Sequence, residues 1–268
     1  MMAAFASNRP PRCAGLATLS GNRMARTGSG DLQTIQNSLL LELSANERNV
    51  LRERMRLVDL PVRAVLNETG APIEFAYFIN SGCVSILSVM SDGKSVEVGL
   101  VGREGFVGAP LLAGFRTSPT RAIMQVGGSA FRISAQDLKQ SVEEFPSLEN
   151  ILERYTHELA IQAIQTAACN RLHEVEHRLA RWLLMTQDRV GDSFDLTQEF
   201  IAHMLGTRRA TVTITAGVLQ KAGLISYTRG RVRIKDRAGL ETGACECYAA
   251  IRRHIAAWRK DARQPNRL

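Results

Sequence analysis

The chain has few aromatic side chains, at 6% of its 268 residues, and only five cysteines. The cysteines are scattered and lack the paired spacing that is typical of zinc and iron–sulfur sites; they are Cys13, Cys83, Cys169, Cys245 and Cys247. Cys245 and Cys247 stand closest, but positions i and i+2 of a predicted helix point to different faces. The sequence therefore predicts reduced thiols, no bound metal and no cofactor.

Long apolar runs are also missing, because no segment approaches the roughly 18 residues of a membrane span. The sequence contains no glycine-rich phosphate loop, no H-E-x-x-H or G-x-S-x-G motif and no convincing acid–base pair, so we predict that it is not an enzyme. Residues 1–30 are rich in Ala, Ser, Gly, Asn and Arg and predict a disordered segment. These absences favour a cytoplasmic protein without a membrane partner.

Positive charge is plentiful and concentrated. Lysine and arginine number 34 against 26 acidic residues, which gives a formal net charge of +8 and a sequence pI of about 9.7. Between Thr207 and Arg237 a single acid, Asp236, stands among the basic residues Arg208, Arg209, Lys221, Arg229, Arg231, Arg233, Lys235 and Arg237. A local excess of this kind favours a polyanionic partner.

The first third of the chain changes from helical to strand-like patterning. Apolar residues recur at helical spacing between residues 31 and 56, and Ser44 followed by Glu47 predicts a capped helix start. Between residues 58 and 133, short β-branched runs alternate with turn signals, of which Asp92-Gly93 predicts a hairpin. Many closely spaced antiparallel strands predict a barrel or a jelly roll, in a domain that covers residues 31–145.

A long amphipathic helix is predicted next, over residues 146–169, after a shorter one that Ser134 caps. Its apolar stripe continues for more than five turns, and long amphipathic helices tend to pair. We therefore predict dimerisation through this helix, with burial against its own domain as the alternative. The residues predicted to face the partner are Leu152, Tyr155, Leu159 and Ile164.

Residues 170–237 predict a winged helix-turn-helix, which makes the expected fold class α+β. A first helix follows residue 170, Thr197 caps a short helix that Gly206 ends, and another helix covers residues 208–222. Two helices joined by a tight glycine-bearing turn are the helix-turn-helix signature. A hairpin with Thr228-Arg229-Gly230-Arg231 at its tip predicts the wing. Residues 238–268 predict a C-terminal helix and tail.

This arrangement indicates that double-stranded DNA is the partner. The helix that begins near residue 208 fits the major groove, with its N-terminal end closest to the bases. Base reading is assigned first to Arg209 and Thr211, because arginine pairs with guanine and threonine contacts the thymine methyl. Phosphate contacts are assigned to Thr197, Arg229 and Arg231. The other residues predicted near DNA are Thr207, Arg208 and Thr213.

The chain resembles the Crp/Fnr family of bacterial transcription regulators. The resemblance covers residues 38–234 and is sharpest at residues 178–183, 205–212 and 222–225. It implies that residues 31–145 form a double-stranded β-helix (jelly roll) with the role of a cyclic-nucleotide-binding-like sensor. It also implies a central dimer helix and a homodimer that reads a near-palindromic site, with RNA polymerase as a further partner. The family's iron–sulfur sensors need clustered N-terminal cysteines, which Cys13 alone cannot supply.

The same resemblance identifies an effector pocket but not its ligand. The stretches that correspond to the family's phosphate-binding cassette are Gly105, Phe106, Val107 and Gly108, then Thr120, Arg121 and Ala122. Phe106 replaces the glutamate that would bind the ribose hydroxyl, and Arg121 is displaced by one residue. A shift of one residue in a strand turns a side chain to the opposite face, which counts against a cyclic nucleotide.

Two other interpretations remain open. The chain could be an architectural DNA binder without sequence preference, or a ligand-binding module whose helix-turn-helix contacts proteins. A metal shared by His173 and His177, which are i and i+4, lacks nearby third and fourth ligands in the sequence. A sensor-sized domain favours the regulator over the architectural DNA binder, and the absence of a phosphate loop and of catalytic motifs leaves the module with little support.

Overall fold

The computed structural model describes residues 34–262, so the predictions for residues 1–30 and the position of Cys13 lie outside the described residues. The first elements are the short helices α1 (Ser38–Glu42) and α2 (Ala45–Arg54). The capping box predicted at the start of α2 is confirmed. The Ser44 hydroxyl accepts from the Glu47 backbone N–H, and the Glu47 carboxylate accepts from the Ser44 N–H.

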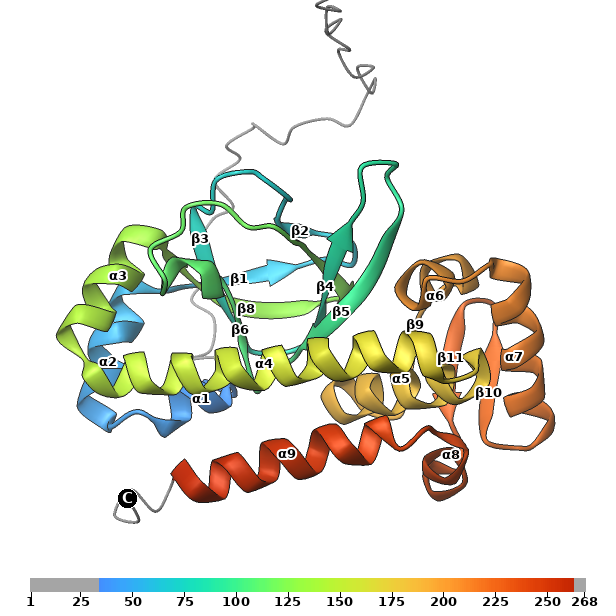
Figure 1. Ribbon diagram of the computed structural model, residues 1–268. Coiled ribbons are helices and arrows are strands. Elements are labelled where there is room, and N and C mark those ends of the chain that lie inside the picture. The colour runs from blue at the N-terminus through green and yellow to red at the C-terminus, as the bar shows by residue number, and fades with distance from the viewer. Residues whose placement is uncertain (1–33, 263–268) are drawn as a thin grey trace, which may run out of the picture. The chain divides into compact units, whose positions relative to one another are not determined.

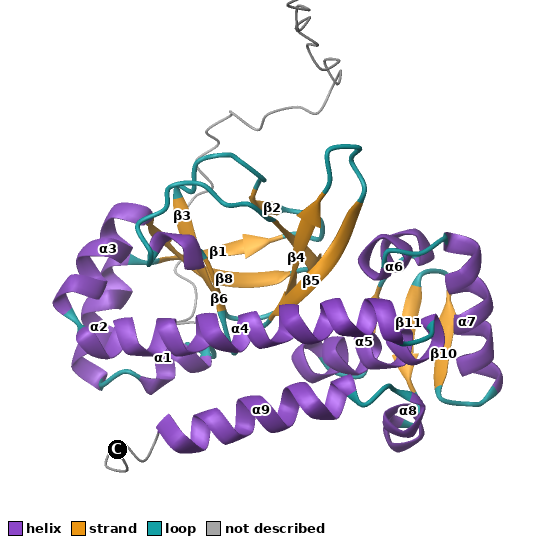
Figure 2. Ribbon diagram, in the orientation of Figure 1, coloured by secondary structure: helices purple, strands orange, loops and turns teal. Residues whose placement is uncertain are grey.

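The β-roll follows as two antiparallel four-stranded sheets (Figures 1 and 2). One sheet has the order β1-β8-β3-β6 and the other β2-β7-β4-β5. The strands are β1 (Arg56–Leu60), β2 (Val65–Asn67), β3 (Phe75–Ile79), β4 (Cys83–Val89), β5 (Ser95–Val101), β6 (Phe106–Val107), β7 (Arg121–Val126) and β8 (Gly128–Ser134). A short 3-10 helix, η1 (Ala109–Leu111), follows β6. The predicted jelly roll is confirmed, including the β4–β5 hairpin, in which Gly93 adopts the positive φ that its turn requires.

Two helices cover the roll, α3 (Ala135–Glu144) and α4 (Pro146–Leu172) (Figure 1). Ser134 caps α3 as predicted. Helix α4 continues three residues beyond the predicted end at residue 169, because no glycine or proline stops it there. Its C-cap is His173, whose extended backbone ends the helix.

The apolar stripe of α4 divides between two faces, which corrects part of the dimer prediction. Leu152 and Tyr155 are buried against the roll of their own chain, and the Tyr155 ring packs 5.6 Å from that of Phe106. Leu159 is half-buried in the same core. Ile164 is 70% exposed. The first half of the stripe packs on the β-roll, so of the four residues predicted to face a partner only Ile164 is exposed.

The C-terminal part begins with helix α5 (Val175–Val190), which a link of two residues separates from α4. Its other elements are β9 (Ser193–Asp195), α6 (Gln198–Leu205), α7 (Arg209–Lys221), β10 (Ile225–Thr228), β11 (Arg231–Ile234), α8 (Arg237–Gly243) and α9 (Cys247–Ala262). The small sheet has the order β10-β11-β9. Trp182, Leu183 and Val212 lie in the core that α5 shares with α6 and α7, and the predicted winged helix-turn-helix is confirmed.

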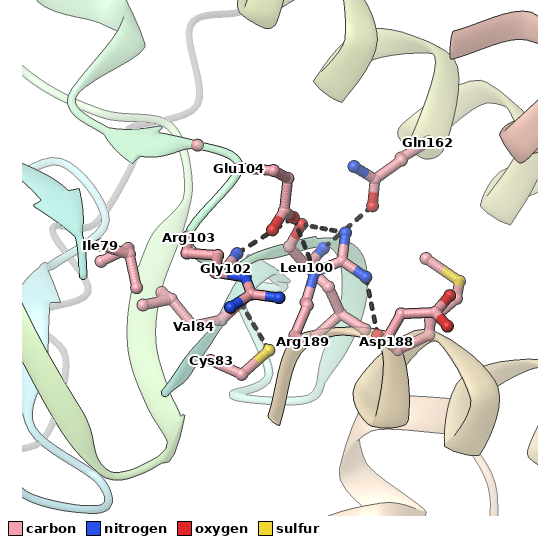
Figure 3. A network of polar contacts seen from close by, with 12 residues as sticks. Ile79, Cys83, Val84, Leu100, Gly102, Arg103, Glu104, Gln162, Asp188 and Arg189 are labelled. Carbon is pink, nitrogen blue, oxygen red and sulfur yellow. Dashed lines mark hydrogen bonds and ion pairs between the residues drawn. The ribbon is translucent and has the colours of Figure 1, made fainter. Parts of the chain in front are cut away.

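A buried polar network joins α5 to the roll (Figure 3). The Arg189 guanidinium lies 2.8 Å from Oε1 of Glu104, in the loop after β5, and also donates to the carbonyls of Leu100 and Met185. A second link is the 2.7 Å hydrogen bond that Trp182 Nε1 donates to Glu97 on β5. Because buried charges are costly without partners, these contacts hold α5 against the sensor in one arrangement.

Glu97 gives this link a pH dependence. Burial raises its pKa from an ordinary 4.5 to about 7, although the hydrogen bond from Trp182 opposes the shift. Between pH 4.5 and about pH 7 the Glu97 carboxyl keeps its proton in the folded chain but loses it in the unfolded chain. The free energy of unfolding therefore falls as pH rises through this range. We expect a loss of at most about 3 kcal/mol between pH 5 and pH 8 that Glu97→Gln, which stays neutral, does not show.

Urea unfolding of both proteins at the two pH values measures the difference. The matched control is Glu153→Gln, because Glu153 is exposed on α4 and should keep the wild-type pH dependence. If the free energy of unfolding changed with pH by the same amount in wild type and Glu97→Gln, Glu97 would be charged in the folded protein.

Candidate nucleic-acid interface

The turn between α6 and α7 is set by a glycine and a buried arginine. Gly206 ends α6 in the left-handed conformation, with φ 60° and ψ 42°, which costs glycine no steric energy. The Arg178 guanidinium, on α5, donates to the carbonyl of Leu205 at the end of α6 and to Asn170 Oδ1 on α4. Arg178 thus satisfies a helix-end carbonyl and keeps the turn in place.

Helix α7 presents its N-terminal end to solvent. Arg208 is its N-cap and Arg209 its first residue, and both are exposed. Val212, Ala216 and Leu219 are buried beneath them, as the spacing predicted. The unpaired backbone N–H groups and the helix dipole make this end favourable for anions. Arg208 and Arg209 add two positive charges at the same place.

The wing is a tight hairpin between β10 and β11. Arg229 and Gly230 both adopt positive φ, 51° and 80°, as a two-residue turn of the I′ type requires. The carbonyl of Gly230 accepts from the Leu196 N–H at 2.6 Å, which places the tip beside the start of α6. Arg231 differs from Arg229, because its guanidinium faces Ser193 and Asp195 of β9.

The start of α6 connects the wing with α7. Thr197 caps α6 by accepting from the Phe200 N–H, and its methyl carbon is 3.9 Å from the ideal Cβ position at Gly230. On the other side, the Thr213 hydroxyl of α7 donates to Gln198 Oε1 at 2.7 Å. The wing tip and α7 therefore flank one short helix, with their arginines on the surface.

Most of the basic side chains here are uncompensated. Within the described residues, six basic side chains between positions 207 and 237 form neither an ion pair nor a side-chain hydrogen bond: Arg208, Arg209, Lys221, Arg229, Arg233 and Lys235. Arg237 instead binds Asp188 and Glu241. Cations that remain unpaired in the folded chain can neutralise phosphates without first losing an internal partner.

The predicted DNA-contacting threonines have different surroundings. Thr213 is exposed and hydrogen-bonded to Gln198, whereas Thr207 and Thr211 are half-buried. The sequence analysis did not single out Ile214, which is 70% exposed on α7. The sequence did contain a signal for it: Ile214 is an apolar residue on the side of the helix that otherwise carries polar residues. Its methyl groups could contact a thymine methyl.

A half-open cavity of about 280 Å³ lies between the roll and α4. Five predicted pocket residues line it, namely Phe106, Val107, Gly108, Thr120 and Ala122. Helix α4 contributes Thr156, Leu159, Ala160 and Ala163. No charged side chain of the described residues is among the lining residues, so the cavity favours an uncharged ligand.

Two predicted pocket residues lie elsewhere. Arg121 points away from the cavity and donates to both carboxylate oxygens of Glu68 through Nε and Nη2, with 2.6 Å from Nη2 to Oε2. The pairing also lowers the pKa of Glu68. Gly105 lies against the Tyr155 side chain, which leaves no room for a Cβ at this position. Strand alternation explains Arg121, whose neighbour Ala122 faces inward.

Comparison with known proteins identifies both parts of the chain. The family profile described as a cyclic nucleotide-binding domain matches residues 57–145, and the profile of the Crp-like helix-turn-helix domain matches residues 177–242. Together they cover more than half of the chain. The chain belongs to the Crp/Fnr family of transcription regulators. The helix-turn-helix described above is accordingly its DNA-binding domain.

Individual relatives are distant. Two proteins named global nitrogen regulator, from Synechocystis and Synechococcus elongatus, are 22% and 23% identical over 181 residues; each match covers 64% of this chain and 80% or 82% of the relative. Among solved structures, FixK2 from Bradyrhizobium japonicum has a TM-score of 0.61 at 16% identity, over 71% of this chain and 98% of that one.

The c-di-GMP-responsive regulator CLP of Xanthomonas campestris has a TM-score of 0.60 at 18% identity, over 71% of this chain and 99% of that chain. At such identities the structural likeness shows the Crp/Fnr fold alone. Within residues 34–262, no helix combines the length and apolarity that crossing a bilayer requires.

The Crp/Fnr sensor of this chain is expected not to bind cyclic AMP or cyclic GMP. A cyclic phosphate needs a cation, and Arg121 is tied to Glu68 outside the cavity. A ligand that binds only the folded state raises the melting temperature, so about 1 mM of either nucleotide should leave it unchanged. A rise that Arg121→Ala abolishes would contradict this expectation.

Proposed function

We propose that this Crp/Fnr regulator acts as a homodimer that reads a near-palindromic DNA site, with one α7 in the major groove of each half-site. The supporting observation is the pairing of two exposed features, the arginines at the start of α7 and the wing tip, on either side of α6. A helix end and a basic hairpin so arranged suit adjacent grooves and phosphates of one duplex.

The roles of individual residues follow from their exposure. Arg209 reads a base, and Ile214 joins it through apolar contact, while Arg208 supports them at the helix end. Arg229, Arg231 and the N-terminus of α6 at Thr197 bind phosphates, which sets register and salt dependence. Thr211 and Thr207, being half-buried, contribute less than the sequence suggested.

The dimer rests on the solvent-facing side of α4. In the second half of α4 the exposed residues recur at spacings of three and four, as in a helix pair. Apart from Arg171 they are small or apolar: Ala160, which also lines the mouth of the cavity, Ile164, Ala167, Ala168 and Leu172. Small residues allow a second helix to approach closely. A two-fold axis along this face would place two copies of α7 for two half-sites about one helical turn apart.

The remaining parts of the proposal are coarser. The protein is a cytoplasmic regulator without catalytic activity, and RNA polymerase is its predicted second partner. The sensor domain comprises residues 31–145 and the DNA-binding domain residues 170–237, with α4 between them. The effector is a small uncharged molecule in the sensor cavity, which has no charged lining residue in the described part of the chain.

The test is selection of DNA by the purified full chain. Random genomic fragments are bound, the complexes separated by gel shift, and the bound pool sequenced. A two-fold symmetric motif with half-sites about 10 base pairs apart supports the regulator. Salt-sensitive binding without a motif would identify an architectural protein instead, and absence of binding would leave an interaction module.

A further inference from the structure

Four potential metal ligands meet where α4 ends and α9 begins. The ligand atoms of Cys169, His173, Cys245 and Cys247 all lie within 4.8 Å of one another. Cys169 Sγ is 3.4 Å from Cys245 Sγ, and Cys247 Sγ is 3.4 Å from His173 Nδ1. The three cysteines form a small buried cluster of their own, and His173 is half-buried.

The ligands come from two segments far apart in the chain. Cys169 and His173 are i and i+4 around the last turn of α4, so they share a face. Cys245 lies 76 residues further on, in the link between α8 and α9, and Cys247 is the first residue of α9. The sequence argument against a C-x-C pair assumed one continuous helix, but Cys245 precedes α9 and turns toward Cys247.

The distances match a tetrahedral ion. With zinc–sulfur bonds of about 2.3 Å and zinc–nitrogen bonds of about 2.0 Å, neighbouring ligand atoms of a tetrahedron lie about 3.5–3.8 Å apart. The separations here, from 3.4 Å to at most 4.8 Å, bracket that edge. A polynuclear iron–sulfur cluster would hold the thiolates of different irons further apart than a single ion does.

The surroundings suit negatively charged sulfur. Gln165 Nε2 donates to Cys247 Sγ at 3.1 Å, a contact typical of the hydrogen bonds that orient metal-bound groups. Arg178 and Arg181 are buried, at 7% and 2% exposure, and within the described residues neither forms an ion pair. Their Nε groups also lack hydrogen-bond partners there. Both arginines interact electrostatically with the cysteines, so these two buried cations would balance a site of three thiolates and one divalent ion, which carries a net negative charge.

We propose that Cys169, His173, Cys245 and Cys247 bind one structural zinc ion in a Cys₃His site. All four residues lie outside the regions matched by the two family profiles, at the end of α4 and the start of α9. His177, the other histidine considered in the sequence, is engaged with the Gly243 carbonyl and is not a ligand.

The ion would fasten α9 to α4. Helix α9 also contacts α4 through Arg259, which binds buried Glu158 with two hydrogen bonds of 2.7 Å. With zinc bound, both ends of this contact are fixed. The site also adjoins Arg178, which holds the turn between α6 and α7, so loss of the metal should loosen that turn as well as α8 and α9.

The experiment is metal analysis of the full chain, purified without a metal-affinity tag. We expect about one zinc per chain, and less than about a tenth of that in Cys169→Ser and Cys247→Ser. Cys83→Ala is the matched control, because Cys83 is a buried free cysteine in the roll, and it should keep its zinc. Stoichiometric iron, or no metal together with no uptake of added Zn²⁺, would overturn the proposal.

Two measurements on the wild-type chain keep the test decisive if the serine variants do not fold. Cobalt(II) replacing the ion should give the strong visible absorption of a tetrahedral thiolate site, and chelation should speed hydrogen exchange in α8 and α9 more than in the roll. An octahedral cobalt spectrum, or a Cys169–Cys245 disulfide in freshly purified protein under anaerobic conditions, would contradict a zinc site.

Discussion

Ile164→Glu is expected to convert the protein into monomers and to weaken binding to its selected DNA site by about 100-fold or more. Ile164 is 70% exposed near the middle of the solvent-facing stripe of α4, and a glutamate there would place two like charges across a two-fold axis. Each half-site would then bind alone, without the effective concentration that the linked second half supplies.

Light scattering measures the mass and a gel shift the affinity. Val62→Glu is the control, because Val62 is an exposed apolar residue in the loop after β1, and the mass should be unaffected. Leu152 and Tyr155 are unsuitable for this test, since charges there would disrupt the core of the protomer. A dimeric Ile164→Glu protein would show that another surface forms the dimer.

Arg209→Ala is expected to weaken the free energy of DNA binding by about 1–3 kcal/mol per half-site, roughly a 5- to 150-fold loss of affinity for each. It should also relax the sequence preference at one base pair of the half-site. Arg209 is exposed at the first position of α7 and has no internal partner among the described residues, so the substitution removes a DNA contact without breaking a folded one. Repeating the DNA selection with the variant identifies the relaxed position.

Two further variants distinguish base reading from phosphate binding. Arg229→Gly removes the wing-tip side chain while keeping the positive φ, and it should weaken all sequences equally and reduce the salt dependence. Arg253→Ala, at an exposed site on α9, should change neither. If Arg209→Ala weakened all sequences alike, Arg209 would be a phosphate contact.

Local features of this fold could be predicted because their causes are local. Ser44, Ser134 and Thr197 cap helices through hydrogen bonds that reach only three residues. Gly206 ends α6 because glycine alone enters the left-handed region freely. The turn at Gly206, helix α7 and the β10–β11 hairpin then follow in the order that defines a winged helix-turn-helix, so this domain could be predicted from the sequence.

The cavity was only partly predictable. Phe106 and Ala122 line it as expected, and the displaced register of Arg121 signalled that its side chain would turn outward. The partner of Arg121, Glu68, lies 53 residues away in the chain, so no local sequence pattern could predict this ion pair. The exposure of Ile214 was also undetected, because helical spacing alone does not show which face a neighbouring element covers.

Patterns along the chain were enough to predict the order of the elements, the caps and turns that bound them, and the concentration of positive charge on one helix end and one hairpin. They did not show which half of α4 the roll would bury, leaving Ile164 outside, or that four potential metal ligands 76 residues apart in two segments would meet. Caps and turns depend on neighbours along the chain, whereas burial and ligand geometry depend on residues that folding alone brings together.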